Sequence, residues 1–230
     1  MKNIAIIPAR SGSKGLKDKN IKELNSKPLL AYSIEAAKNS QLFDEIMVST
    51  DSEKYAEIAK SFGANVPFLR SETNSGDKAS SWNVVIEVLS RYLEKGEKFD
   101  SICLLQPTSP LRTSQDIIGS YKLLDSKQAD AVTSVCEVDH SPLWVMTLPE
   151  NLSLVEFNKR DSDTPRQFLE KYYRLNGAVY IRKIKYDNSK IQILDSKDYA
   201  FIMPREHSID IDTELDFIIA KSLLLYSIKN

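Results

Sequence analysis

Residues 4–20 read IAIIPARSGSKGLKDKN, an apolar run that turns abruptly into a basic loop containing two glycines. The apolar run does not alternate with polar side chains, which is typical of a strand buried on both faces. The loop carries four cationic side chains within ten residues, although the whole chain has a formal net charge of only −1. In an open α/β sheet, ligands bind beyond the carboxyl ends of the strands, which is where this loop would lie.

Working outward from this stretch, apolar runs continue to alternate with helical patterns. After residues 4–8, strands are predicted at 45–50, 101–106, 130–138, 176–181 and 199–204. Helices are predicted at 28–39, 52–63, 80–96 and 114–127, and from residue 213 onward. This order predicts an α/β fold with a mostly parallel central sheet and helices on both faces.

The alternation stops at residues 139–173, which contain three prolines and the charged stretch NKRDSDTPRQ. About 35 residues cannot bury a core of their own. We therefore interpret this segment as an insertion within a single domain that spans residues 1–230. Its apolar side chains, Leu143 and Trp144 among them, predict burial against a second subunit.

Composition excludes several classes of protein. The 31 Lys and Arg residues nearly balance the 32 Asp and Glu residues, so bulk attraction to nucleic acid or to an anionic membrane is not expected. The sequence shows neither a signal-peptide pattern nor an apolar run that approaches a membrane span. The two cysteines, Cys103 and Cys136, lie in apolar strands and predict buried, unreactive thiols. We therefore expect a cytoplasmic protein.

The basic loop is suited to a triphosphate. Gly12 and Gly15 allow a ligand to approach the backbone closely, and exposed N–H groups in such a loop form a concavity for anions. Arg10, Lys14 and Lys19 add positive charge. Neither GxxxxGK[ST] nor GxGxxG is present, which counts against a P-loop enzyme and a dinucleotide dehydrogenase. A solvated basic loop without a ligand is the alternative.

The stretch SIDID at residues 208–212 has a signature of its own. Alternate residues of an extended segment share a face, so Ile209 and Ile211 would point into the core while Asp210 and Asp212 point together into a cleft. Two neighbouring carboxylates repel each other unless a cation lies beside them. Mg²⁺ binds one or two carboxylates together with phosphate oxygens and water. The alternative is a surface strand with exposed acids.

Four motifs follow one another along the chain: PARSGSKGLKDKN at 8–20, QPTSPLR at 106–112, NGAVYI at 176–181 and SIDIDTELD at 208–216. Together they resemble the acylneuraminate cytidylyltransferases, the CMP-sialic acid synthetase family, over nearly the whole chain. The resemblance implies a Rossmann-like nucleotidyltransferase fold and a homodimer in which the insertion contacts the partner. It also implies a reaction that depends on Mg²⁺ (or Mn²⁺) and converts CTP and a nine-carbon 2-keto acid sugar to the CMP-sugar and pyrophosphate.

The resemblance implies roles for single residues as well. Catalytic roles are implied for Arg10, Lys14, Asp210 and Asp212, of which the two aspartates would hold the metal. The implied contacts with the nucleotide come from Pro8, Ala9, Arg10, Lys14, Lys19, Asn20, Arg70, Ala79, Ser80 and Ser81. The implied contacts with the sugar come from Gln106, Arg174, Asn176 and Tyr180, with Arg112 beside the same cleft. Taken without the resemblance, the two serines could equally cap a helix, and Arg112 could equally belong to a structural ion pair.

Two departures from the family pattern leave the sugar open. Trp144 stands where members specific for sialic acid tend to carry Lys, and Leu175 stands where many carry Pro. Legionaminic, pseudaminic and Kdn-type acids therefore remain alternatives to N-acetylneuraminate, and so does Kdo. A nucleotide-binding module without turnover is a further alternative, because a fold does not fix a function. His140 and His207 have no ligand-like spacing and predict ordinary polar roles.

Overall fold

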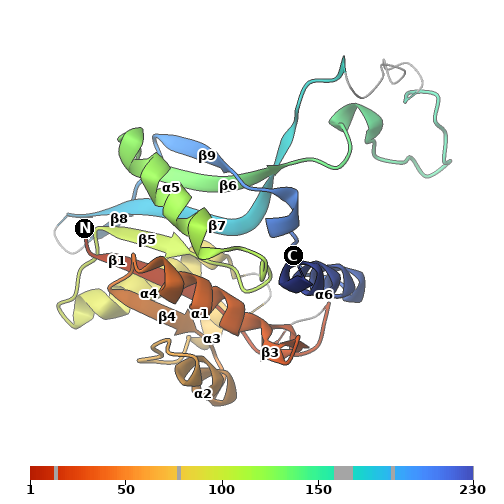
Figure 1. Ribbon diagram of the computed structural model, residues 1–230. Coiled ribbons are helices and arrows are strands. Elements are labelled where there is room, and N and C mark those ends of the chain that lie inside the picture. The colour runs from red at the N-terminus through yellow and green to blue at the C-terminus, as the bar shows by residue number, and fades with distance from the viewer. Residues whose placement is uncertain (13–14, 77–78, 158–167, 188–189, 230) are drawn as a thin grey trace.

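A mixed sheet in the strand order β4-β1-β5-β7-β6-β9 runs through the middle of the molecule (Figure 1). The computed structural model describes residues 1–12, 15–76, 79–157, 168–187 and 190–229. The strands are β1 (Asn3–Pro8), β4 (Glu45–Ser49), β5 (Ser101–Leu104), β6 (Ala131–Glu137), β7 (Tyr173–Asp187), β8 (Lys190–Ile193), which pairs with β7, and β9 (Asp198–Ile202). All of them except β7 run in the same direction, so the predicted mostly parallel sheet is confirmed.

Helices cover both faces of this sheet, as the sequence predicts (Figure 1). They are α1 (Leu29–Ser40), α2 (Glu53–Ser61), α3 (Glu72–Ser75), α4 (Ser81–Glu94), α5 (Ser114–Ser126) and α6 (Glu214–Lys229). Short 3-10 turns are η1 (Lys19–Ile21), η2 (Pro142–Trp144) and η4 (Arg205–His207), and a separate two-stranded sheet pairs β2 (Glu23–Leu24) with β3 (Lys27–Pro28).

Strand β1 explains why the apolar run of the sequence lacks alternation. Ala5 and Ile7 pack into a core cluster with α1, α2 and α5 on one face of the sheet. Ile4 and Ile6 pack into a second cluster with α4 on the other face. All four side chains are fully buried, because successive side chains of a strand point to opposite faces and both faces are covered.

Helix ends near the cavity described below are fixed by side-chain caps. The Ser80 hydroxyl accepts a hydrogen bond from the Asn83 N–H and caps α4. Thr113 and Asp116 form a reciprocal capping box at the start of α5. Thr213 and Asp216 exchange the same pair of bonds at the start of α6. Each cap satisfies backbone N–H groups that a helix leaves without partners in its first turn.

The insertion predicted at 139–173 extends beyond the ends of β6 and β7 (Figure 1). The structure describes residues 139–157 and 168–173 of it, and η2 is the helical turn in those ranges. Val145, Leu148 and Phe168 are each more than half exposed. None of the described residues of this segment belongs to the core clusters of the sheet. These three apolar side chains are therefore not covered by the core of this chain.

Candidate functional site

A cavity of about 520 Å³ lies beyond the carboxyl ends of β1 and β5. Five pieces of chain contribute to it: the loop after β1, the residues before α4, the start of α4, the loop after β5 and the segment before α6. The predicted site residues that line it are Pro8, Arg10, Lys19, Asn20, Arg70, Ala79, Ser81, Gln106, Asp210 and Asp212. The position agrees with the rule for ligand sites in open α/β sheets.

The loop after β1 is held over the cavity by contacts to neighbouring strand ends. Ser11 donates to the Asp51 carboxylate from its backbone N–H (2.8 Å) and from its hydroxyl (3.0 Å). The Asn20 amide donates to the Arg10 carbonyl at 3.0 Å, which closes the loop on itself. Lys14 lies outside the described residues. Ala9 is fully buried and donates its N–H to the Ser49 carbonyl, so it meets the cavity at most through its backbone.

Lys19 joins the basic loop to the acidic segment, 193 positions away in the sequence. Its ammonium group donates to the Ile211 carbonyl at 2.6 Å and to the Asp212 carboxylate at 2.9 Å. A Cβ on Gly15 would lie 2.9 Å from the Asp212 carbonyl oxygen, so only glycine fits against this segment without a shift. The cations predicted to bind phosphate and the carboxylates predicted to bind metal therefore share one cavity.

Asp210 and Asp212 lie on the same side of their segment, as the alternation predicts. Ile211 between them is fully buried, Ile209 is partly buried, and both pack in one cluster with α6. The Ile211 N–H donates to the Thr108 carbonyl at 2.8 Å, and the segment belongs to no strand of the sheet. Of the alternative, the strand is therefore wrong, whereas Asp212 does have the exposed side chain that it predicts.

The two carboxylates differ in environment. Asp212 has a largely exposed side chain, paired with Lys19. Asp210 is half-buried, and its Oδ1 is enclosed without a hydrogen-bond partner among the described residues. Burial raises the pKa of Asp210 above its usual value and the charge of Asp212 raises it further, while Thr108, Lys19 and Arg174 oppose the shift.

This arrangement fits a divalent cation with a preference for oxygen ligands. A buried carboxylate oxygen that lacks a partner is costly unless a cation or donor completes it. The described residues contain no group of three or more His, Cys, Asp and Glu side chains placed to hold a metal. Two carboxylates with room for phosphate oxygens and water are the set that Mg²⁺ uses.

Arg70 is the most deeply anchored cation among the described residues that line the cavity. It is 8% exposed, and its guanidinium donates to the hydroxyl and the carbonyl of Ser49 at the end of β4. Burial lowers its pKa to about 10, which leaves it a cation at neutral pH. Ala79 and Ser81 line the cavity, whereas the Ser80 hydroxyl is engaged as the cap of α4. The capping alternative therefore holds for Ser80.

Three of the residues predicted to contact the sugar lie at or near the acidic end of the cavity. Gln106 lines it. Arg174 is exposed, and its guanidinium donates to the Ser208 carbonyl at 3.3 Å and favours the ionised form of Asp210. Tyr180 is half-buried and packs edge-on against Trp82. Burial and then the charge of Asp210 raise the pKa of Tyr180.

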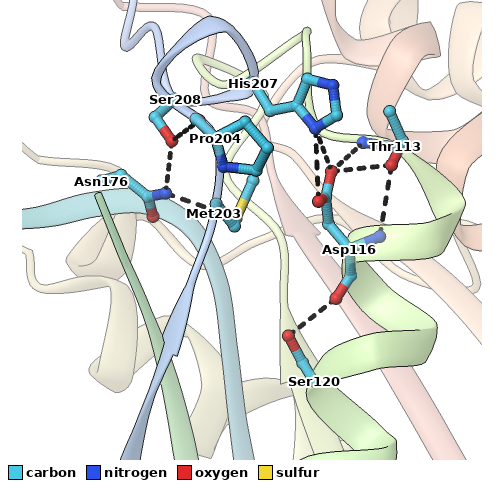
Figure 2. A network of polar contacts seen from close by, with 8 residues as sticks. All are labelled: Thr113, Asp116, Ser120, Asn176, Met203, Pro204, His207 and Ser208. Carbon is cyan, nitrogen blue, oxygen red and sulfur yellow. Dashed lines mark hydrogen bonds and ion pairs between the residues drawn. The ribbon is translucent and has the colours of Figure 1, made fainter. Parts of the chain in front are cut away.

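Asn176 does not face the cavity in this structure. Its side chain is 1% exposed and is bonded to Ser134, Ser208 and the Ala178 N–H, and it also contacts Met203 (Figure 2). A direct contact between this amide and a sugar would require these bonds to break. The sequence placed Asn176 correctly on a strand beside the site, but the pattern could not show which partners its amide has.

Arg112 is a structural residue in this chain. It is 3% exposed and donates to the carbonyls of Gln106 and Ala178 and to the Ser33 hydroxyl. The packed structural position of the alternative is therefore confirmed, but the predicted ion pair is wrong, because the hydrogen-bond partners are carbonyls and a hydroxyl. Arg112 ties the loop after β5 to β7 and α1.

His207 has an ordinary polar partner, as predicted. Its Nδ1 lies 3.0 Å from an oxygen of Asp116, the residue that caps α5 (Figure 2). The pair holds η4 to α5 just before the acidic segment begins.

Sequence reasoning missed several residues of the site. Asn74, Gly76, Val84, Pro107 and Thr108 also line the cavity. Pro107 and Thr108 belong to QPTSPLR, so the motif already pointed to them. Gly177 was missed too. Its φ is +74°, and the Asn-Gly pair is a signal for such backbone.

Comparison with known proteins agrees with the four motifs. A family model described as cytidylyltransferase matches residues 4–224. The chain is 40% identical over 220 residues to the N-acylneuraminate cytidylyltransferase of Escherichia coli O18:K1:H7, covering 95% of this chain and 51% of that protein. It therefore spans about half the length of that relative.

Two relatives match over nearly their whole length. The CMP-N,N'-diacetyllegionaminic acid synthase of Legionella pneumophila is 35% identical and covers 97% of each chain. The pseudaminic acid cytidylyltransferase of Campylobacter jejuni is 34% identical and covers 100% of this chain and 98% of its own.

Among solved structures, CMP-2-keto-3-deoxy-manno-octonic acid synthetase complexed with CTP superposes with a TM-score of 0.68, covering 99% of this chain and all of that one. At 14% identity this likeness shows the same fold. In the described ranges, no helix combines the length and apolar character that crossing a membrane requires. The resemblance read from the motifs is confirmed, and the chain belongs to the cytidylyltransferase family.

Proposed function

We propose that the chain transfers CMP from CTP to an acidic nonulosonic sugar and releases pyrophosphate. One observation carries the proposal. The cationic loop after β1 and the carboxylates of Asp210 and Asp212 line the same cavity, joined by Lys19. Phosphoryl transfer depends on positioning and charge neutralisation. The cavity offers cations that can bind phosphates and carboxylates that can bind a metal ion.

In the proposed reaction, the anomeric hydroxyl of the sugar attacks the α-phosphorus of CTP. A bond forms between that oxygen and phosphorus, the bond from the α-phosphorus to the bridging oxygen breaks, and the hydroxyl proton leaves. Arg10 and Lys14 hold the triphosphate, Arg10 by a forked pair of hydrogen bonds. Lys19 lines the same cavity and would add a further positive charge beside the phosphates.

Asp210 and Asp212 would hold Mg²⁺ (or Mn²⁺), with Asp210 offering the oxygen that lacks a partner. When bound, the cation would neutralise charge on the phosphates and help to align the sugar hydroxyl. One of these two carboxylates would also accept the proton of the sugar hydroxyl. Their mutual repulsion would be relieved by the cation.

The sugar is proposed as a nonulosonic acid, N-acetylneuraminate or a close relative. Arg174 is exposed beside Asp210 and is suited to the sugar carboxylate. The names of the relatives support the class, since they include sialic, legionaminic and pseudaminic acid enzymes. Trp144 and Leu175 are the departures from the family pattern that leave the choice within this class open.

The decisive experiment is a pyrophosphate-release panel. The chain is mixed with CTP and Mg²⁺ and offered N-acetylneuraminate, legionaminic, pseudaminic and Kdn-type acids and Kdo, with UTP and chelator as controls. We expect release with CTP and one of the nonulosonic acids, with little release from UTP or in excess chelator. CTP binding by calorimetry without release for any sugar would instead favour the nucleotide-binding module.

We further propose a cytoplasmic homodimer joined through the insertion. Val145 and Leu148 are exposed at 57% and 58%, in a segment that the core of this chain leaves uncovered. Sedimentation at micromolar concentration tests this. Val145→Glu should shift the dimer towards monomer, whereas Ile86→Glu on the outer face of α4, 39% exposed, should not. A monomeric wild-type chain would contradict the proposal.

A further inference from the structure

A large bulge in β7 lies directly behind the cavity. Thr133 of β6 pairs with Tyr180, but Val135 pairs with Leu175, so residues 176–179 of β7 stand opposite Ser134 alone. Gly177 within the bulge adopts a φ of +74°. Bulges interrupt the ladder and redirect side chains, and they are frequent next to active sites.

The side chains of Asn176 and Ser134 replace the hydrogen bonds that the bulge removes. The Asn176 Oδ1 accepts from the Ser134 hydroxyl at 2.6 Å and from the Ala178 N–H at 3.2 Å. The Ser134 hydroxyl oxygen accepts from the Val179 N–H at 2.8 Å. The amide oxygen of Asn176 is thus fully occupied within the sheet.

The amide nitrogen of Asn176 reaches across to the segment that leads to the two aspartates. It donates to the Ser208 hydroxyl at 2.9 Å and lies 3.3 Å from the Met203 sulfur (Figure 2). The Ser208 hydroxyl in turn donates to the Pro204 carbonyl at 2.7 Å. Ser208 is fully buried and, among the described residues, is not one that lines the cavity. Its hydroxyl therefore connects Asn176 to the segment before Asp210 and does not face a ligand in the cavity.

On the other side of the bulge, Gly177 lies next to residues that line the cavity. A Cβ on Gly177 would lie 2.6 Å from the Gln106 side-chain oxygen and 3.7 Å from Oδ2 of Asp210. Gly177 thus leaves room beside Asp210 that a side chain would fill, while Asn176 holds Ser208, two residues before Asp210. We infer that Asn176 acts on the reaction as a positioning residue, through Ser208, by fixing where the Asp210 carboxylate stands.

This inference rests on the proposed function, because it assigns Asp210 to the metal. The test measures Mn²⁺ binding in the presence of CTP and without sugar, from the electron paramagnetic resonance signal of free Mn²⁺. Ser208→Ala should weaken Mn²⁺ binding at least about fivefold and raise the Mg²⁺ concentration for half-maximal turnover, with the KM for the sugar changed less than about twofold. Asn176→Ala should do the same, and the double variant should be no worse than Asn176→Ala alone.

Ser120→Ala is the matched control. Its hydroxyl is fully buried like that of Ser208 and also donates to the carbonyl four residues earlier, at 2.8 Å, but it lies on α5 (Figure 2). This variant should bind Mn²⁺ like the wild type. Thermal unfolding of every variant separates loss of fold from loss of position, and if Asn176→Ala does not fold, Ser208→Ala decides alone.

Three outcomes overturn the inference. If Ser208→Ala binds Mn²⁺ like the wild type, Ser208 does not connect Asn176 to the metal site. Asn176→Ala with a raised KM for the sugar and unchanged Mn²⁺ binding makes Asn176 a direct sugar contact instead. A wild-type chain that fails to bind Mn²⁺ with CTP overturns the proposed metal site itself, and the inference falls with it.

Discussion

Gly177→Ala is the substitution that most directly tests how the fold shapes the cavity. At a φ of +74°, a residue with a Cβ is strained by about 1–2 kcal/mol. For a chain of this size that lowers the melting temperature by roughly 2–8 °C. In addition, the new methyl group would stand 2.6 Å from the Gln106 side-chain oxygen, so the amide must retreat by about 0.8 Å to reach the ordinary contact distance of 3.4 Å.

A shift of that size beside the reacting groups is expected to lower kcat/KM by roughly tenfold to a hundredfold. The chain offers a matched control, since Gly96 has a φ of +79° and open space around its Cβ position. Gly96→Ala should lose comparable stability and keep its activity. The assay is thermal unfolding together with pyrophosphate-release kinetics on both variants. Equal activity in the two variants would show that the Gly177 contact does not matter to catalysis, and the reasoning would fail.

Three further predictions follow. Asp212→Asn should fold and lose at least about a hundredfold in kcat, because a charge at the metal is removed; Glu214→Gln, which also loses a carboxylate bonded to a lysine, should stay near wild type in the same Mg²⁺ titration. Lys14→Ala should lower kcat/KM for CTP by far more than twofold, through the loss of a charge-assisted phosphate contact; a smaller change would mean that this lysine is solvated surface. Cys103 and Cys136 are buried and burial raises the pKa of Cys103 to about 12, so an aromatic disulfide reagent at pH 8 should titrate neither thiol until denaturant is added; fast reaction of the native chain would contradict this.

Much of the fold was predictable because burial on both faces leaves a direct mark on the sequence. The runs IAII and ICLL are fully buried in β1 and β5. An apolar run does not show, however, whether the strand runs parallel or antiparallel to its neighbours. Strand β7 contains the apolar run at residues 178–181, similar to those of its neighbours, yet it runs antiparallel to them. Direction depends on how the preceding connection returns to the sheet, and here that connection is the long insertion, which carries no helical periodicity.

The site was predictable where a residue type has few uses, and less so where a side chain has many possible partners. A loop rich in cations and glycine after a buried strand predicts an anion site, and it lines the cavity. Arg112 and Asn176 belong to motifs of the site, but their N–H groups donate to buried carbonyl and hydroxyl groups. Those partners come from α1, β6, β7 and the segment before α6, which only the folded chain brings together.

The two aspartates show where such reasoning ends. The pattern D-x-D places Asp210 and Asp212 on one face, and it gives both the same chemistry. The fold then separates them. Asp212 projects towards solvent and pairs with Lys19, whereas Asp210 is half-buried and has an oxygen without a hydrogen-bond partner among the described residues. Two identical carboxylates thus become one that is paired with a lysine and one that is half-buried, with an oxygen that has no hydrogen-bond partner among the described residues. The second is where a cation would relieve the greater cost.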